Sequence, residues 1–382
     1  MLLSFHVANH RSLRDEQRLS LVPPHVRARG GLSAVPVTGI FGANAAGKSS
    51  LLDALGRMRR EIRNDEPGKN GARTPFALDP DSRARPTRYV VELLLGGSRF
   101  EYGYSVDDAH ITEEWLYQSA SAERTGRVVF ERTGMARGCA FPPAPLRASA
   151  ETVAADRLLL PAAADAGQQE AQRVYDWFGA LCVYPDQFDG RCAVNQNRLD
   201  RLSMLLRAMD TGVDKVVVRP GGAVVAGEVR GGRGPSTCSG EGDSWMDELA
   251  FRSGPLGMLA ASDLSGGTRT LVKLCLAVLA TMDAGNVLVV DDFGAGLHLY
   301  VSRAVVDSFQ ERRTNPRNAQ LIFASHDSGL MDRIRGDRVL RRDQVWFVEK
   351  DGDGASRLYP VSDFGVEEEA ASGAAAGAAS DS

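Results

Sequence analysis

The start of the chain alternates apolar and polar residues in the way that a half-buried strand does. Leu3, Phe5 and Val7 are separated by polar residues, which predicts a strand with one face in a core. A second apolar run around Leu19 and Leu21 could pair with it. We therefore expect the fold to begin with an antiparallel strand pair.

A hairpin is predicted further along. Residues 89–95 and 99–104 are rich in β-branched and aromatic residues and flank Gly96-Gly97, a combination typical of two strands joined by a tight turn. Residues 107–135 continue the same kind of pattern. The first third of the chain is thus expected to hold an antiparallel β-subdomain.

The pattern then becomes helical, from about 150 to 210, before a strand at 216–218 and a glycine-rich stretch at 221–242. Past residue 256 the chain alternates helices and continuous apolar strands, which predicts a parallel sheet. The elements expected there are a buried helix at 271–282, a strand at 287–290, a helix at 301–309, a strand at 321–323 and a hairpin at 345–361.

Residues 42–49 read GANAAGKS, which matches the phosphate-binding loop pattern G-x-x-x-x-G-K-[ST]. They lie between an apolar run ending at Phe41 and a helical run beginning at Leu51. A strand, a glycine loop and a helix in this order turn backbone N–H groups toward one point, where a polyphosphate binds. Lys48 would hold the β- and γ-phosphates, and Ser49 would ligate Mg²⁺. The predicted contacts to ATP are Gly42, Ala43, Asn44, Ala45, Ala46, Gly47, Lys48, Ser49 and Ser50.

The strand at 287–290 ends in Asp291 and Asp292. ATP hydrolysis needs an acid at a strand end near Mg²⁺ and a group that orients the attacking water. We predict the first role for Asp291 and the second for Asp292. The alternative is a buried strand that simply ends in two solvated carboxylates.

Two further segments have both a functional and a structural interpretation. Residues 264–268 read LSGGT and precede the buried helix, where Ser265 or Thr268 could merely cap that helix. His326 follows the strand at 321–323 and could be an ordinary structural histidine. Their order after the phosphate loop, with the Asp pair between them, favours the functional interpretation.

These motifs, in this order, resemble the ABC-like ATPases related to RecF, SMC proteins and the OLD family. More narrowly, the chain resembles the stand-alone AAA-type ATP-binding proteins of bacterial abortive-infection and phage-defence loci. The resemblance covers about 1–135 and 256–362. It rests on FHVANHRSL, IFGANAAGKSSLLDAL, FEYGYSV, ITEEWLY, SDLSGGT, VVDDFGAGLH and FASHDSGLMD.

The resemblance implies an α/β P-loop NTPase fold, an ABC-ATPase-like head with an N-terminal antiparallel β-subdomain and a mainly helical insert. The expected division is 1–139 for the first half of the ATPase domain, 140–255 for the insert, 256–365 for the second half and 366–382 for a disordered tail.

The resemblance also implies how the motifs work together. Ser265, Gly266 and Gly267 would cap the γ-phosphate of ATP bound to a second protomer, so that a homodimer sandwiches two nucleotides. His326 would reach the γ-phosphate in its own protomer, which makes Lys48, Asp292 and His326 the expected catalytic residues.

This chain departs from the family pattern at several positions. Asp292 stands where most ABC-type ATPases have Glu, and His10 replaces an aromatic residue of the opening strand. Gln187 is a candidate for the Q-loop glutamine. Arg11 either approaches the base or ribose of the nucleotide or is a surface arginine.

Composition limits the choice of partners. The net charge of −4 gives no global reason to expect nucleic acid, although a local basic face around Arg132 or Arg341 stays open. The five cysteines are scattered without a C-x-x-C pair, which predicts neither a zinc site nor a disulfide framework. No long apolar run suggests a membrane span, so we expect a cytoplasmic protein.

The leading functional hypothesis is an ATP-driven dimerising switch in phage defence, with an effector protein acting in trans. The residues after His326 are too few for a Toprim nuclease domain, and no HNH pattern or zinc cluster occurs. The alternative is a RecF-like DNA-repair ATPase that binds DNA. A transporter subunit fits poorly, because its segment between the phosphate loop and the LSGG loop is far shorter.

Overall fold

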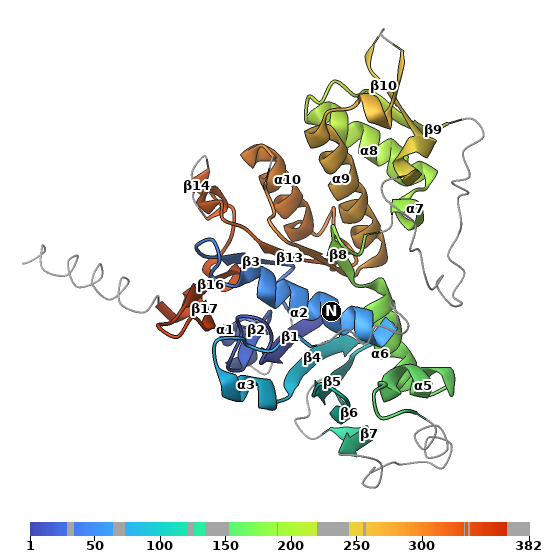
Figure 1. Ribbon diagram of the computed structural model, residues 1–382. Helices are drawn as coiled ribbons and strands as arrows, with labels where there is room; N and C mark the ends of the chain where they lie inside the picture. Colours follow the sequence, from blue (N-terminus) through green and yellow to red (C-terminus); the bar gives the residue numbers. More distant parts are fainter. Residues whose placement is uncertain are drawn as a thin grey trace, which may run out of the picture.

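The computed structural model describes most of the chain. The described residues are 1–28, 34–63, 73–120, 126–133, 153–188, 190–219, 244–254, 257–295, 297–331, 333–334 and 337–364. Within them the strands form two six-stranded sheets, one three-stranded sheet and one short strand pair (Figure 1). The glycine-rich stretch at 221–242 and the tail at 366–382 lie outside the described residues.

The first six-stranded sheet is the antiparallel β-subdomain that the alternating pattern predicted. Its strand order is β2-β1-β4-β5-β6-β7. The β4–β5 turn is made by Gly96 and Gly97, whose φ angles of +57° and +81° suit a tight hairpin turn. The strands are β1 (Leu2–Ala8), β2 (Gln17–Ser20), β4 (Thr87–Leu95), β5 (Ser98–Val106), β6 (Ile111–Ala120) and β7 (Arg127–Thr133).

The second six-stranded sheet is the mainly parallel sheet expected from the continuous apolar runs, in the order β17-β16-β3-β13-β12-β8. Only the edge strand β17 runs antiparallel to its neighbour. Every residue of β3, β12 and β13 is buried, because layers of structure cover both faces. The strands are β3 (Val37–Phe41), β8 (Cys182–Tyr184), β12 (Val287–Val290), β13 (Gln320–Ala324), β16 (Val345–Lys350) and β17 (Ser356–Pro360).

Strand β8 differs from the sequence-based expectation. The segment 140–255 was expected to be a mainly helical insert, yet β8 comes from within it and pairs in parallel with β12. The strand has only three residues, which is too short for a period to show in the sequence. Within the described part of this segment, β8 thus belongs to the parallel sheet, and the domain division itself stays a prediction.

The parallel sheet separates two cores. On one face, Ile40, Ile322 and Val348 pack in a core shared with the antiparallel sheet and with α2 (Lys48–Arg63), α5 (Leu159–Asp165) and α6 (Gln169–Ala180). On the other face, Phe41 and Phe323 pack against α9 (Gly266–Ala284) and α10 (Leu299–Gln310). Figure 1 shows this layering, with α9 and α10 on one side of the sheet and α2 and the antiparallel sheet on the other.

A third core lies in a smaller lobe, against which one face of α9 also packs. Leu264, Leu271 and Val272 pack there with Leu199, Leu202 and other apolar residues of the lobe. Its elements are α7 (Gly190–Ala193), α8 (Gln196–Ala208), β9 (Lys215–Val218), β10 (Leu249–Arg252) and β11 (Met258–Ala260).

The remaining elements are short. They are α1 (Pro24–Ala28), α3 (Pro80–Ala84), β14 (Arg333–Ile334), β15 (Asp337–Arg338), η1 (Ser244–Glu248), η3 (Ala261–Asp263), η4 (Ser328–Leu330), η5 (Arg342–Gln344) and η6 (Val361–Phe364). Among the described residues, no helix has the length and apolar character needed to span a membrane.

Candidate nucleotide site

The phosphate-binding loop lies between β3 and α2, as its sequence context predicts. Ala45 has a φ of +63°, the left-handed conformation that turns successive N–H groups into a concave cradle. Gly42 and Gly47 have φ angles of +151° and +113°. A Cβ at Gly42 would lie 2.2 Å from the carbonyl oxygen of Val348, and one at Gly47 would lie 2.1 Å from Ser356 Oγ. Both glycines are thus required by backbone conformation and by close approach.

Lys48 begins α2 and folds back over the loop. Its Nζ donates hydrogen bonds of 2.9 Å to the carbonyl oxygens of Gly42 and Ala43. Ser49 is exposed at the same helix N-terminus, and Ser50 is partly buried behind it. The ammonium and the first-turn N–H groups therefore collect positive charge at one end of α2, which suits a bound polyphosphate.

The register of the parallel sheet brings the other predicted groups to the same edge. Ala324 pairs with Ile40, and Val290 pairs with Phe323, so the carboxyl ends of β3, β13 and β12 lie side by side. In such sheets this edge is where ligands bind. The phosphate loop, His326 and the Asp291–Asp292 pair all follow these three strand ends.

Asp292 and His326 contact each other directly. Asp292 Oδ1 lies 3.0 Å from His326 Nδ1, and the two side chains are 64% and 54% exposed. Asp292 has a φ of +52°, which is uncommon for a residue other than glycine and is typical of functional sites and turns. Asp291 is half-buried, and its Oδ1 accepts a 3.0 Å hydrogen bond from the backbone N–H of Asp292.

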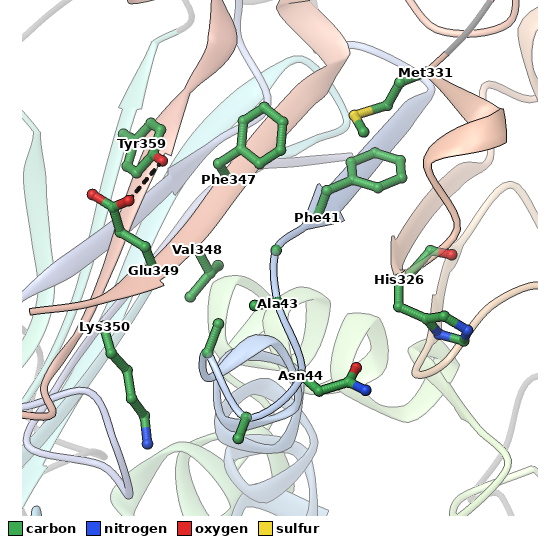
Figure 2. A pocket seen from close by; sticks show the side chains of 14 residues that line it. Phe41, Ala43, Asn44, His326, Met331, Phe347, Val348, Glu349, Lys350 and Tyr359 are labelled. Carbon is green, nitrogen blue, oxygen red and sulfur yellow. Dashed lines mark hydrogen bonds between the residues drawn. The ribbon is translucent and has the colours of Figure 1, made fainter.

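A cleft of about 580 Å³ lies beside the phosphate loop. Its walls are loop residues 42–46, Ser325 and His326 after β13, and residues of the β16–β17 hairpin. Figure 2 shows the loop running through this cleft, with His326 on one side and Lys350 on the other. The structure thus brings the phosphate loop and His326 together in one cavity.

The LSGG segment lies elsewhere. Ser265 is the N-cap of α9, and its Oγ accepts a 3.1 Å hydrogen bond from the backbone N–H of Thr268. Gly266 and Gly267 are exposed, with open space around the position of a Cβ. The neighbouring Leu264 packs in the smaller lobe. Within the part of the chain that the structure describes, the cleft lining includes neither Ser265 nor the two glycines.

Gln187 follows β8 but its amide is directed to the side of α2. Its Nε2 donates to the carbonyl oxygen of Gly56 at 3.0 Å, and its Oε1 accepts from Arg59 at 3.0 Å. Gly56 lies two turns into α2. Gln187 therefore joins β8 to the helix body, and its role as a Q-loop residue stays a prediction.

Arg11 and His10 belong to one network at α2. Arg11 Nε lies 2.9 Å from Asp53 Oδ2, and its side chain is about half exposed. His10 is buried, with Nε2 2.9 Å from Asp53 and Nδ1 3.0 Å from the hydroxyl of Tyr89. Burial lowers the pKa of His10, while Asp53 acts in the opposite direction. His10 thus fills the place of an aromatic residue by linking Tyr89 to Asp53.

Sequence reasoning missed two residues that touch the loop. Ser356 lies in β17, where no motif marks it, and Ser12 lies in the FHVANHRSL segment, where no role was predicted for it. Ser356 Oγ lies 2.8 Å from Ser12 Oγ and 2.5 Å from the carbonyl oxygen of Ala46. Only the folded chain brings them beside the phosphate loop.

One protein-family model, described as "AAA domain, putative AbiEii toxin, Type IV TA system", matches residues 37–133 and 251–332. A solved structure of the Smc head domain with an extended coiled coil, bound to the C-terminal domain of ScpA and derived from Pyrococcus furiosus, is also similar. That match covers 98% of this chain and 98% of that chain, with 10% identity and a TM-score of 0.44. A search of curated proteins found no match.

The two segments of the family match contain the phosphate loop with most of the antiparallel sheet, and the LSGG segment with β12 and β13. They contain all of the motifs given above except FHVANHRSL, which spans residues 5–13. Over these two segments the chain is therefore similar to the AAA domain that the family model describes, a P-loop ATPase domain named together with an abortive-infection toxin.

Proposed function

We propose that this protein binds and hydrolyses ATP and that ATP switches it between a monomer and a dimer that controls an effector protein in trans. The observation that carries the proposal is the contact between His326 and Asp292 at the strand edge that also presents the phosphate loop. That edge combines a cradle for phosphate with two groups able to hold and orient a water.

Each predicted site residue has a role that suits its position. Lys48 donates to the β- and γ-phosphates in place of the loop carbonyls that it contacts in this structure. Ser49 and Asp291 hold Mg²⁺, whose charge offsets that of the phosphates when it is bound. Asp292 orients the attacking water, and His326 contacts the γ-phosphate while it orients Asp292.

The exposure of the LSGG segment supports the dimer. The N-terminus of the 19-residue helix α9 presents N–H groups next to two glycines without side chains, in a lobe separate from the cleft of the same chain. Such an end suits a γ-phosphate bound to a second copy. Because each copy offers a phosphate loop and an LSGG segment, the pairing is two-fold and isologous.

The role in defence rests on the family description, which names an AbiEii toxin and a type IV toxin–antitoxin system. We propose that the effector is a separate protein that recognises the ATP-bound dimer. The DNA-binding alternative has less support, because Arg132 is buried and pairs with Glu114 at 2.8 Å. Arg341 pairs with Asp343 at 3.1 Å.

The test is a titration of the purified protein with ATP and Mg²⁺, followed by measurement of phosphate release. Lys48→Ala is the matched variant, since it removes the side chain that carries the ammonium and leaves the backbone N–H groups of the phosphate loop in place. We expect the wild type to bind and to release phosphate and Lys48→Ala to do neither. Equal phosphate release by both proteins would contradict the proposal. Filter binding to DNA with and without ATP tests the alternative.

A further inference from the structure

The phosphate loop can present its N–H groups inward only if its carbonyl groups point outward. A buried carbonyl that points into protein needs a hydrogen-bond donor. Ala46 is buried, and its carbonyl oxygen accepts a 2.5 Å hydrogen bond from Ser356 Oγ. Ser356 is itself 1% exposed, so this bond is shielded from bulk water. The outward direction of this carbonyl therefore depends on one hydroxyl from the far end of the chain.

Ser356 belongs to a cluster of three hydroxyl groups behind the loop. Ser356 Oγ lies 2.8 Å from Ser12 Oγ, and Ser12 Oγ lies 2.9 Å from Ser50 Oγ. These serines come from β17, from the β1–β2 connection and from the first turn of α2. The cluster lies next to Gly47, since a Cβ there would meet both Ser356 and Ser12.

The position of Ser356 is fixed independently of the loop. Its backbone N–H donates to the carbonyl oxygen of Ser12 at 2.7 Å. Leu358 N–H donates to Gln17 Oε1 at 2.8 Å, and Arg14 lies 3.0 Å from Asp353. The β16–β17 hairpin is thus held against the β1–β2 connection on both sides of Ser356. Its hydroxyl is presented to the loop by a support that does not itself bind phosphate.

We propose that Ser356 is a positioning residue for the phosphate loop, which keeps the peptide between Ala46 and Gly47 oriented for nucleotide binding. The carbonyl of Ala46 and the N–H of Gly47 belong to the same peptide unit. Without the Ser356 hydroxyl, the buried carbonyl of Ala46 has no hydrogen-bond donor. Rotation of the Ala46–Gly47 peptide would relieve this cost by pointing the carbonyl elsewhere. The same rotation would move the N–H of Gly47 out of the cradle of N–H groups that faces the phosphate. This inference rests on the proposed nucleotide binding.

The experiment compares Ser356→Ala with Ser105→Ala in the full-length chain. Ser105 is also buried, and its hydroxyl donates to Glu113 in the antiparallel sheet. A fluorescent ADP analogue with Mg²⁺ gives the dissociation constant, and thermal unfolding without nucleotide gives the melting temperature. We expect Ser356→Ala to bind about tenfold more weakly, the effect of one lost hydrogen bond. Ser105→Ala should bind as the wild type does, and both apo proteins should melt alike.

Two further variants separate positioning from folding. Ser12→Ala removes a hydroxyl of the cluster that does not contact Ala46, so its affinity should stay within about twofold of the wild type. Ser356→Cys replaces the hydroxyl by a slightly larger thiol, which is a weak donor, and should lose affinity even if Ser356→Ala does not fold.

Wild-type affinity in Ser356→Ala or Ser356→Cys would overturn the inference, as would an equal loss of affinity in Ser12→Ala. Absence of nucleotide binding by the wild-type protein would instead contradict the proposed function.

Discussion

His326 and Asp292 are joined by a hydrogen bond of 3.0 Å although they belong to different strand ends, β13 and β12. The bond links two side chains that are both more than half exposed. Asp292 also has a left-handed backbone conformation, with a φ of +52°. This relationship makes Asp292 the first position to test.

Asp292→Asn should keep ATP binding and stop turnover. Asn has nearly the same shape and is among the residues that tolerate a positive φ, so the local backbone is preserved. The amide lacks the negative charge that orients water, so phosphate release should fall by about 100-fold or more. Phosphate release and ATP titration check this, and light scattering should show a dimer that persists with ATP and Mg²⁺. Wild-type turnover in this variant would mean that another residue orients the attacking water, and His326 would be the first candidate.

Ser265→Arg should prevent the ATP-dependent dimer and hydrolysis while leaving ATP binding intact. The long side chain would occupy the open space in front of Gly266 and Gly267, where the γ-phosphate of a second copy is expected. Met204→Arg is the control, because Met204 is 63% exposed in the same lobe. Light scattering with ATP and Mg²⁺ measures both variants. A dimer of normal size in Ser265→Arg would contradict the shared site.

Glu114→Ala should destabilise the fold strongly. Glu114 is fully buried in β6, accepts hydrogen bonds from the N–H groups of Leu159 and Leu160, and pairs with Arg132 at 2.8 Å. Its removal leaves a buried guanidinium without its carboxylate, which costs about 3–5 kcal/mol. Urea unfolding gives the free energy of unfolding.

The neighbouring Glu113 provides the matched control. Its partner Arg88 lies 3.3 Å away, and both side chains are nearly half exposed. Glu113→Ala should therefore cost less than about 1 kcal/mol. Similar losses in the two variants would show that burial of the Glu114–Arg132 pair does not govern stability at this point.

The free energy of unfolding should fall as the pH drops below 6.5. Burial lowers the pKa of His10 below its ordinary value of 6.5, so the unfolded chain takes up a proton that the folded chain does not. Stability is therefore complete above that value and is lost at up to about 1.4 kcal/mol per pH unit below it. Urea unfolding from about pH 7 to pH 5 measures this slope.

His10→Gln is the matching variant for this titration. Gln keeps a donor for Asp53 and an acceptor for the Tyr89 hydroxyl, but it does not titrate. Its unfolding free energy should depend less on pH in the same range. If the slope of the unfolding free energy against pH were unchanged in His10→Gln, the loss of stability at low pH would come from other titrating groups.

The local features of the fold were predictable because they rest on neighbouring residues. The alternation at Leu3, Phe5 and Val7, the hairpin at Gly96-Gly97 and the buried helix after Ser265 all appear in the structure near their predicted places. The phosphate loop and the acids after β12 also follow from local pattern. The assignment of roles to these residues remains a prediction.

Other features depend on contacts that no local pattern records. Ser356 and Ser12 are 344 positions apart, and long-range contacts such as the pairing of β16 with β3 and the bond from Ser356 N–H to the Ser12 carbonyl bring them to the same loop. Arg132 was a candidate for a basic face, yet it is buried and forms an ion pair with the buried Glu114. Strand β8 was missed because three residues next to helices carry no period.

Helix α9 has a mechanical consequence. One face of the helix, which includes Leu271 and Leu279, packs in the smaller lobe, and another face, which includes Leu274 and Met282, packs on the parallel sheet. The helix leads through Gly285 into β12. The lobe is tied to the sheet a second time through β8, the strand beside β12. A rotation of the smaller lobe would therefore displace α9 and act on the two adjacent strands β12 and β8 together. If the proposed dimer forms at Ser265, force applied there would be delivered to β12, the strand that precedes Asp291.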